Sequence, residues 1–146
     1  MGKNRGFTLV ELVVTIAVIA VVSIMAAPSM ANLMEKRRYD QNARELLLAL
    51  SQAKSQAILN RSDVSVNLAS NSVNTLTSLN WNVINNTTLS ISPTVTASTF
   101  IFNSNGLISN IAGDRTLTLC NAKVKIQKTI VVTRLGTYVI KPEGTC

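Results

Sequence analysis

Gly6-Phe7-Thr8-Leu9-Val10-Glu11 opens an apolar run of 21 residues, from Phe7 to Ala27, in which Glu11 is the only charged residue. As an α-helix this run would extend about 31 Å, which matches the hydrocarbon core of a bilayer. The run is apolar on every side, whereas a helix packed on a soluble core is apolar along one stripe. The stretch therefore predicts a transmembrane helix.

A secretory signal that is removed after export is the alternative for this segment. Lys3 and Arg5 would then form its basic start, and the apolar run its centre. The run is longer than the usual 7–15 apolar residues of such a signal, and it contains an acid at Glu11. Both features favour a helix that the mature protein keeps, with Lys3 and Arg5 on the cytoplasmic side.

Glu11 is the one residue of this run whose presence in a membrane helix needs a chemical explanation. A carboxylate costs several kcal/mol in lipid by most estimates, so a membrane acid indicates a functional site. The alternative is a side chain that reaches the aqueous boundary, since Glu11 lies near the start of the run.

The short basic leader ending at Gly6, followed by Phe7-Thr8-Leu9-Val10-Glu11 and an apolar helix, resembles the signal of type IV pilins and type II secretion pseudopilins. The resemblance implies cleavage by a prepilin peptidase between Gly6 and Phe7, and methylation of the new Phe7 amine. It also implies that Glu11 pairs with the Phe7 amine of a neighbouring subunit in a filament. Pro28 matches the position where the anchor helix of pilins kinks, because proline breaks a helical hydrogen bond.

The helix is expected to continue from about residue 29 to residue 61. Its second half contains no glycine or proline, and apolar residues recur there every three or four positions, which predicts one buried stripe. These residues are Ala43, Leu46, Leu47, Leu50, Ala53, Ala57 and Ile58. Asn60 is a suitable C-terminal stop.

The remainder predicts short strands, because apolar and polar residues alternate over several stretches. The alternating stretches are Val64–Leu68, Phe100–Phe102, Leu117–Leu119 and Lys123–Ile126, and a hairpin around Gly136 joins 129–133 to 137–140. The segment from the seventies to the nineties, around Trp81, is rich in Ser, Thr and Asn and is expected to form long loops. We expect five to seven strands packed on the helix, an α+β arrangement.

The head carries a narrower resemblance. Residues 43–66, 100–106 and 130–137 resemble the helix, central strand and closing hairpin of the FimT/GspH group of minor pilins and minor pseudopilins. The group implies a type IV pilin-like fold, with a long N-terminal helix packed against a small antiparallel β head. The expected organisation is a leader (1–6), a membrane or filament-core helix (7–28), an amphipathic helix half (29–61) and a β-rich head (62–146).

Cys120 and Cys146 are the only cysteines. A head exported across a membrane meets oxidising conditions, which favours a disulfide, and two buried free thiols are the alternative. The bond would close a loop of 27 residues and attach the C-terminal hairpin to the sheet.

Neither catalysis nor a cofactor is expected. The chain has no histidine, which excludes Ser-His and Cys-His sites, and two cysteines do not complete a zinc site. The acids form no catalytic motif, and there is no glycine-rich phosphate loop. We expect no enzyme and no metal.

The C-terminal region is basic. Residues 115–146 contain six cations against Glu143 alone: Arg115, Lys123, Lys125, Lys128, Arg134 and Lys141. A strand would place Lys123 and Lys125 on one face, and such a patch attracts phosphate backbones. Some FimT-type pilins serve DNA uptake, but they follow the hairpin glycine with arginines, whereas Gly136 is followed by Thr137, Tyr138 and Val139. A solvated basic face is the alternative.

Three functions therefore stay open: a structural minor pilin that assists or primes assembly of a type IV pilus, a minor pilin that binds double-stranded DNA, and a minor pseudopilin of type II secretion. Each implies the prepilin peptidase and other pilins as partners. Each also implies an inner-membrane precursor with a cytoplasmic N-terminus and a periplasmic head, and the two pilus functions place the mature chain at the cell surface.

Overall fold

The computed structural model describes residues 7–93 and 98–146, and for residues 25–28 it describes the backbone alone. Two compact units are present, Met1–Glu35 and Lys36–Cys146. One helix, α1 (Leu9–Asn60), contributes to both. It ends at Asn60, the C-terminal stop expected from the sequence, and Arg61 follows it in the left-handed conformation that commonly ends helices.

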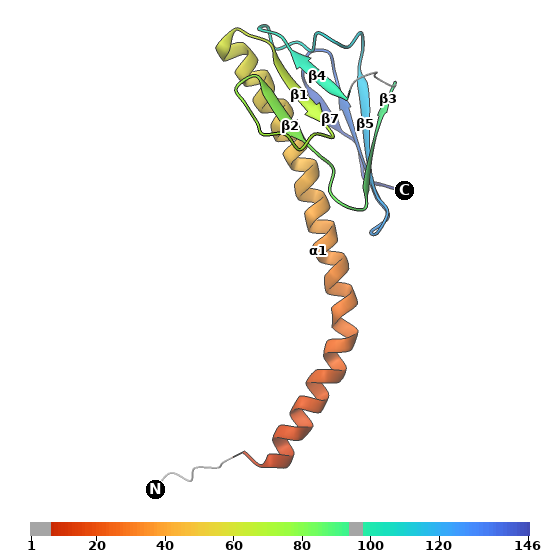
Figure 1. Ribbon diagram of the computed structural model, residues 1–146. Coiled ribbons are helices and arrows are strands. Elements are labelled where there is room, and N and C mark those ends of the chain that lie inside the picture. The colour runs from red at the N-terminus through yellow and green to blue at the C-terminus, as the bar shows by residue number, and fades with distance from the viewer. Residues whose placement is uncertain (1–6, 94–97) are drawn as a thin grey trace. The chain divides into compact units, whose positions relative to one another are not determined.

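Eight strands follow among the described residues of the second unit: β1 (Val64–Leu68), β2 (Ser78–Trp81), β3 (Thr87–Ser92), β4 (Thr99–Phe102), β5 (Arg115–Asn121), β6 (Ile126–Val132), β7 (Tyr138–Ile140) and β8 (Gly144–Thr145). They form two sheets, one in the order β2-β1-β4 and the other in the order β3-β5-β6-β7, with β8 also paired to β6. Figure 1 shows the strands gathered beside the C-terminal half of α1. The expected α+β arrangement of a long N-terminal helix and a β head is confirmed.

The core lies between this half of the helix and both sheets. The predicted stripe supplies Ala43, Leu46, Leu50, Ala53 and Ala57, all buried, whereas Leu47 is half-buried and Ile58 is 46% exposed. The sheets contribute alternate residues, as the period-two pattern requires. These are Val64, Val66, Phe100, Phe102, Leu117, Leu119, Ile130 and Val132.

Three strand expectations were wrong. The segment around Trp81 is not all loop, because it contains β2 and β3. The described residues form eight strands rather than the expected five to seven. The head is antiparallel as expected except for β1 and β2, which pair in parallel, with Ser65 opposite Ser78. Residues 122–125 form the turn between β5 and β6 rather than a strand, and Lys125 adopts a left-handed φ of 55° there. Lys123 and Lys125 therefore do not share a strand face.

Candidate functional site

The start of the first unit combines a helix cap with exposed apolar side chains. Glu11 donates its backbone N–H to Thr8 Oγ1 at 3.2 Å, so Thr8 caps α1 in a Thr-x-x-Glu pattern. Phe7 is 81% exposed, and Glu11 is exposed as well. Thr8 is a site residue that sequence reasoning missed, although the capping pattern is readable in the sequence. Gly6 lies outside the described residues, so the cleavage site itself is not seen.

The helix beyond this cap presents large apolar side chains on all sides. Each is at least half exposed: Leu9, Val10, Leu12, Val13, Val14, Ile16, Val18, Ile19, Val21, Val22 and Ile24. By length and composition no single described helix qualifies as a membrane span, whereas Leu9–Ile24 and Ser29–Asn60 qualify together as a bent pair. The side chain of Pro28, where a kink is expected, lies outside the described residues. The exposed apolar surface needs a covering medium, either lipid or other helices.

The six C-terminal cations do not form one patch. Lys123 and Lys125 lie in the turn that follows Asn121, whereas Arg115 is opposite Val132 at the other end of the same strand pair. Arg134 lies just beyond Val132, and it too is at that far end. Seven residues of strand separate the two ends, about 23 Å. The expected single phosphate-binding patch is therefore divided between the two ends of the sheet.

Two of these cations are also engaged within the protein. The Arg115 guanidinium donates to the carbonyls of Gly113 and Asp114 at 3.3 and 3.2 Å. Lys128 Nζ lies 2.8 Å from Asp40 Oδ1 and 3.1 Å from Glu143 Oε1. Because two carboxylates neutralise Lys128, it has little charge to offer a phosphate.

Tyr39 completes this cluster from the helix. Its hydroxyl donates to the Leu119 carbonyl at 2.8 Å, and Lys128 Nζ lies 5.7 Å from the centre of its ring. Burial raises the pKa of Tyr39 to about 12. Burial by itself would lower the pKa of Lys128, but the hydrogen bonds to Asp40 and Glu143 outweigh it, and the pKa is raised. Neither Tyr39 nor Asp40 was predicted as a site residue, because their partners, Leu119 and Lys128, lie at least 80 residues away in sequence.

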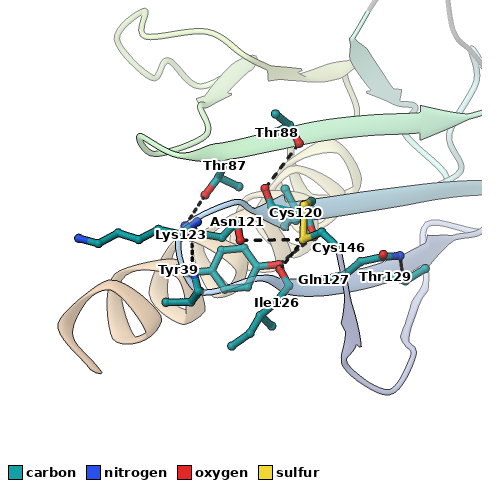
Figure 2. Close-up of a disulfide and its surroundings, with 12 residues drawn as sticks. Tyr39, Thr87, Thr88, Cys120, Asn121, Lys123, Ile126, Gln127, Thr129 and Cys146 are labelled. Carbon is teal, nitrogen blue, oxygen red and sulfur yellow. Dashed lines mark hydrogen bonds between the residues drawn. A yellow bond between two sulfur atoms is a disulfide. The ribbon is translucent and has the colours of Figure 1, made fainter. Parts of the chain in front are cut away.

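The disulfide between Cys120 and Cys146 is present, with the two Cα atoms 5.9 Å apart. It ties the last residue to β5, next to β8, which pairs with Ile126 and Gln127 of β6. Figure 2 shows Tyr39 at the same end of the sheet as the disulfide, and the Lys123 side chain extending away from it. Buried Asn121 donates to Thr87 Oγ1 at 3.0 Å and accepts from Lys123 N, which fixes the β5–β6 turn.

A polar cleft of about 460 Å³ lies between α1 and the segment 70–84. Asn42, Trp81 and Asn82 form part of its wall, and two hydrogen bonds join these three residues. Asn42 Nδ2 donates to the Asn82 carbonyl, and the Trp81 indole donates to the Asn42 carbonyl. Within the described residues, no group of three or more His, Cys, Asp or Glu side chains gathers as a metal site would require.

Residues 1–27 match the prokaryotic N-terminal methylation motif, and residues 42–136 match the family of the type II transport protein GspH. The second match covers well over half of the chain. The chain belongs to the GspH family. It is a minor-pilin-like protein of the FimT/GspH type, and its N-terminal segment is a prepilin signal.

The fold of this GspH-family protein is also that of a known pilus subunit. The type IV minor pilin FimU of Pseudomonas aeruginosa is 19% identical in sequence and superposes with a TM-score of 0.56, over 75% of this chain and 92% of that one. At this identity the likeness concerns the fold alone. No curated protein sequence is significantly similar to the chain.

Proposed function

We propose that this GspH-family protein is a minor pilin that is built into a type IV pilus, where it assists or primes assembly. The observation that carries the proposal is the exposed apolar helix behind a prepilin signal. Lipid covers such a surface in the precursor, and the helices of other subunits cover it in a filament. The fold of FimU, whose own description is type IV minor pilin, supports the pilus as the filament.

The processing step follows from the signal. The prepilin peptidase cleaves between Gly6 and Phe7 on the cytoplasmic side, and the new Phe7 amine is methylated. The precursor lies in the inner membrane with the head in the periplasm. Mass spectrometry of the mature N-terminal peptide tests this directly, because the peptide should begin at a methylated Phe7. An intact leader on filament-bound chains would contradict the proposal.

Glu11 then acts as the membrane partner of a neighbouring subunit's Phe7 amine. A competing role for the Glu11 side chain is to support the Thr8 cap, because a Glu or Gln at this position can accept a hydrogen bond from the backbone N–H of the cap residue. Two variants distinguish the two roles. Glu11→Gln keeps a residue suited to the Thr8 cap but removes the charge, whereas Glu11→Leu removes both. If pairing matters, both variants are lost from sheared pili. If Glu11→Gln is incorporated as well as the native chain, the pairing is refuted and the cap alone remains.

Type II secretion is the second candidate, because the matching family is described as a type II transport protein. Deletion of the gene distinguishes the two systems. A minor pilin leaves protein secretion intact and reduces surface pili, whereas a minor pseudopilin leaves pili intact and retains secreted enzymes in the periplasm. Complementation with the native chain should restore whichever phenotype is lost.

A further inference from the structure

β7 is an edge strand with three exposed apolar side chains. Tyr138, Val139 and Ile140 are 40%, 58% and 54% exposed. Among the described strands β7 pairs with β6 alone. Proteins normally protect such edges with charge, proline or bulges, because a free apolar edge recruits other strands. The opposite edge of the same sheet, β3, exposes polar Thr88, Ser90 and Ser92 instead.

The backbone of this edge has unused hydrogen-bonding groups. Lys141 N donates to the Thr129 carbonyl, and Thr133 N donates to the Thr137 carbonyl, each at 2.9 Å. In an antiparallel pair the residues that bond to the partner strand alternate, so Val139 points its N–H and C=O towards β6. Tyr138 and Ile140 therefore direct theirs to the free side, where no described strand pairs with them.

The charge around the edge limits what can occupy it. Exposed Lys141 follows β7, and exposed Arg134 precedes it in the hairpin turn. Glu143 does not neutralise them fully, because it is paired with Lys128. Two copies of this chain joined edge to edge would bring like charges together, whereas a strand with acidic residues on either side of an apolar centre would complement them.

We propose that β7 binds an extended segment of a different pilin subunit, apolar at its centre and flanked by acidic residues, which adds as a further strand to this sheet. Backbone bonds to Tyr138 and Ile140 supply affinity, and their side chains contact one face of the added strand. The Val139 side chain lies on the opposite face of the sheet and contacts the added strand there. Pro142 limits the paired segment to a few residues. The inference rests on the proposed function, since the assembling filament supplies the neighbouring subunit.

Site-specific photocrosslinking in the native cells tests this with the full chain. A benzophenone amino acid replaces Tyr138, and in a matched strain it replaces Ser90 on the polar β3 edge. After irradiation, adducts are recovered from sheared pili and from membranes, and the crosslinked peptide is sequenced. We expect the Tyr138 probe to crosslink to a strand segment with acidic flanks in another pilin, and the Ser90 probe to give no such adduct.

A charge placed on the edge provides the second arm. Ile140→Glu should lower the Tyr138 adduct about tenfold, as loss of about 1.4 kcal/mol of binding would, because a negative charge on the edge repels the acidic flanks of the partner strand, whereas Ser90→Glu should leave it unchanged. Adducts to a second copy of this chain, to a segment without acids, or no adduct above the Ser90 level would overturn the inference. If Ile140→Glu does not fold, the comparison between the Tyr138 and Ser90 probes in the otherwise native chain still tests the inference.

These outcomes are separable from those of the proposed function. A chain that is present in sheared pili but gives no Tyr138 adduct refutes the strand partner and leaves the minor pilin intact. A chain that is absent from pili, yet crosslinks through Tyr138 in the membrane to the expected segment, supports the strand partner and refutes pilus incorporation.

Discussion

Lys128 of β6 and Asp40 of α1 form an ion pair at 2.8 Å, which joins the helix to the C-terminal sheet. Glu143 belongs to the C-terminal tail that the disulfide holds in place, and its Oε1 lies 3.1 Å from the same ammonium group. A lysine that the sequence suggests as a phosphate ligand is therefore a structural connection among helix, sheet and C-terminus. Its environment explains this, since its side chain is only 19% exposed and lies between two carboxylates.

Lys128→Met should destabilise the protein by about 1–2 kcal/mol, between the values for exposed and for buried ion pairs, because it leaves Asp40 without its partner. Lys123→Met is the matched control, since Lys123 is exposed in a turn and makes no described ion pair. Urea denaturation of the full chain in detergent, followed by tryptophan fluorescence, measures both. Equal midpoints for the two variants would contradict the role of Lys128.

The disulfide should contribute about 3.5 kcal/mol, the chain-entropy value for its loop. The double variant with Cys120→Ser and Cys146→Ser should lose this amount of unfolding free energy, and the native chain should lose the same amount when it is reduced. Because β8 is two residues long, we also expect amide exchange to increase at Gly144 and Thr145. Unchanged exchange there would mean that β8 is held by its pairing with β6 alone.

Stability should fall as the pH rises from 10 to 12. The unfolded chain loses the Tyr39 proton near pH 10, while the folded chain holds it to about pH 12, so high pH favours unfolding. Lys128 acts in the same direction. Because the pKa of Lys128 is raised in the folded chain, its contribution to stability is complete below about pH 10.5 and is lost as the pH rises through the pKa of the folded chain. Urea midpoints across this range, with Tyr39→Phe as the comparison, should show a shallower fall in the variant.

Gly136→Ala should destabilise the head by about 1–3 kcal/mol. Gly136 has a φ of 68°, and an added Cβ would lie 2.7 Å from the Gly106 carbonyl oxygen, a backbone atom that cannot easily move. Gly113→Ala is the control, because nothing lies within 4 Å of the added atom. Its thermal midpoint should stay near that of the native chain, and a comparable loss in both variants would refute the close contact at Gly136.

Local sequence patterns determined much of this protein. The all-round apolar run and the three- and four-residue spacing predicted α1, because helix periodicity is a property of neighbouring residues. Period-two alternation predicted β1, β4, β5 and the β6–β7 hairpin, and Gly136 does take the left-handed conformation of its turn. The export signal favoured a disulfide, and only two cysteines were available for it.

Only the tertiary structure decided which distant residues meet. Leu89 and Ile91 alternate within β3, yet it is their pairing with Leu119 and Leu117 of β5 that stabilises a stretch rich in Ser and Thr as a strand. Four of the six cations are close in sequence, but the β5–β6 hairpin places Lys123 and Lys125 at one end of the sheet and Arg115 and Arg134 at the other. Strand pairing and ion pairs such as Lys128–Asp40 depend on packing between distant segments, and no local pattern encodes that.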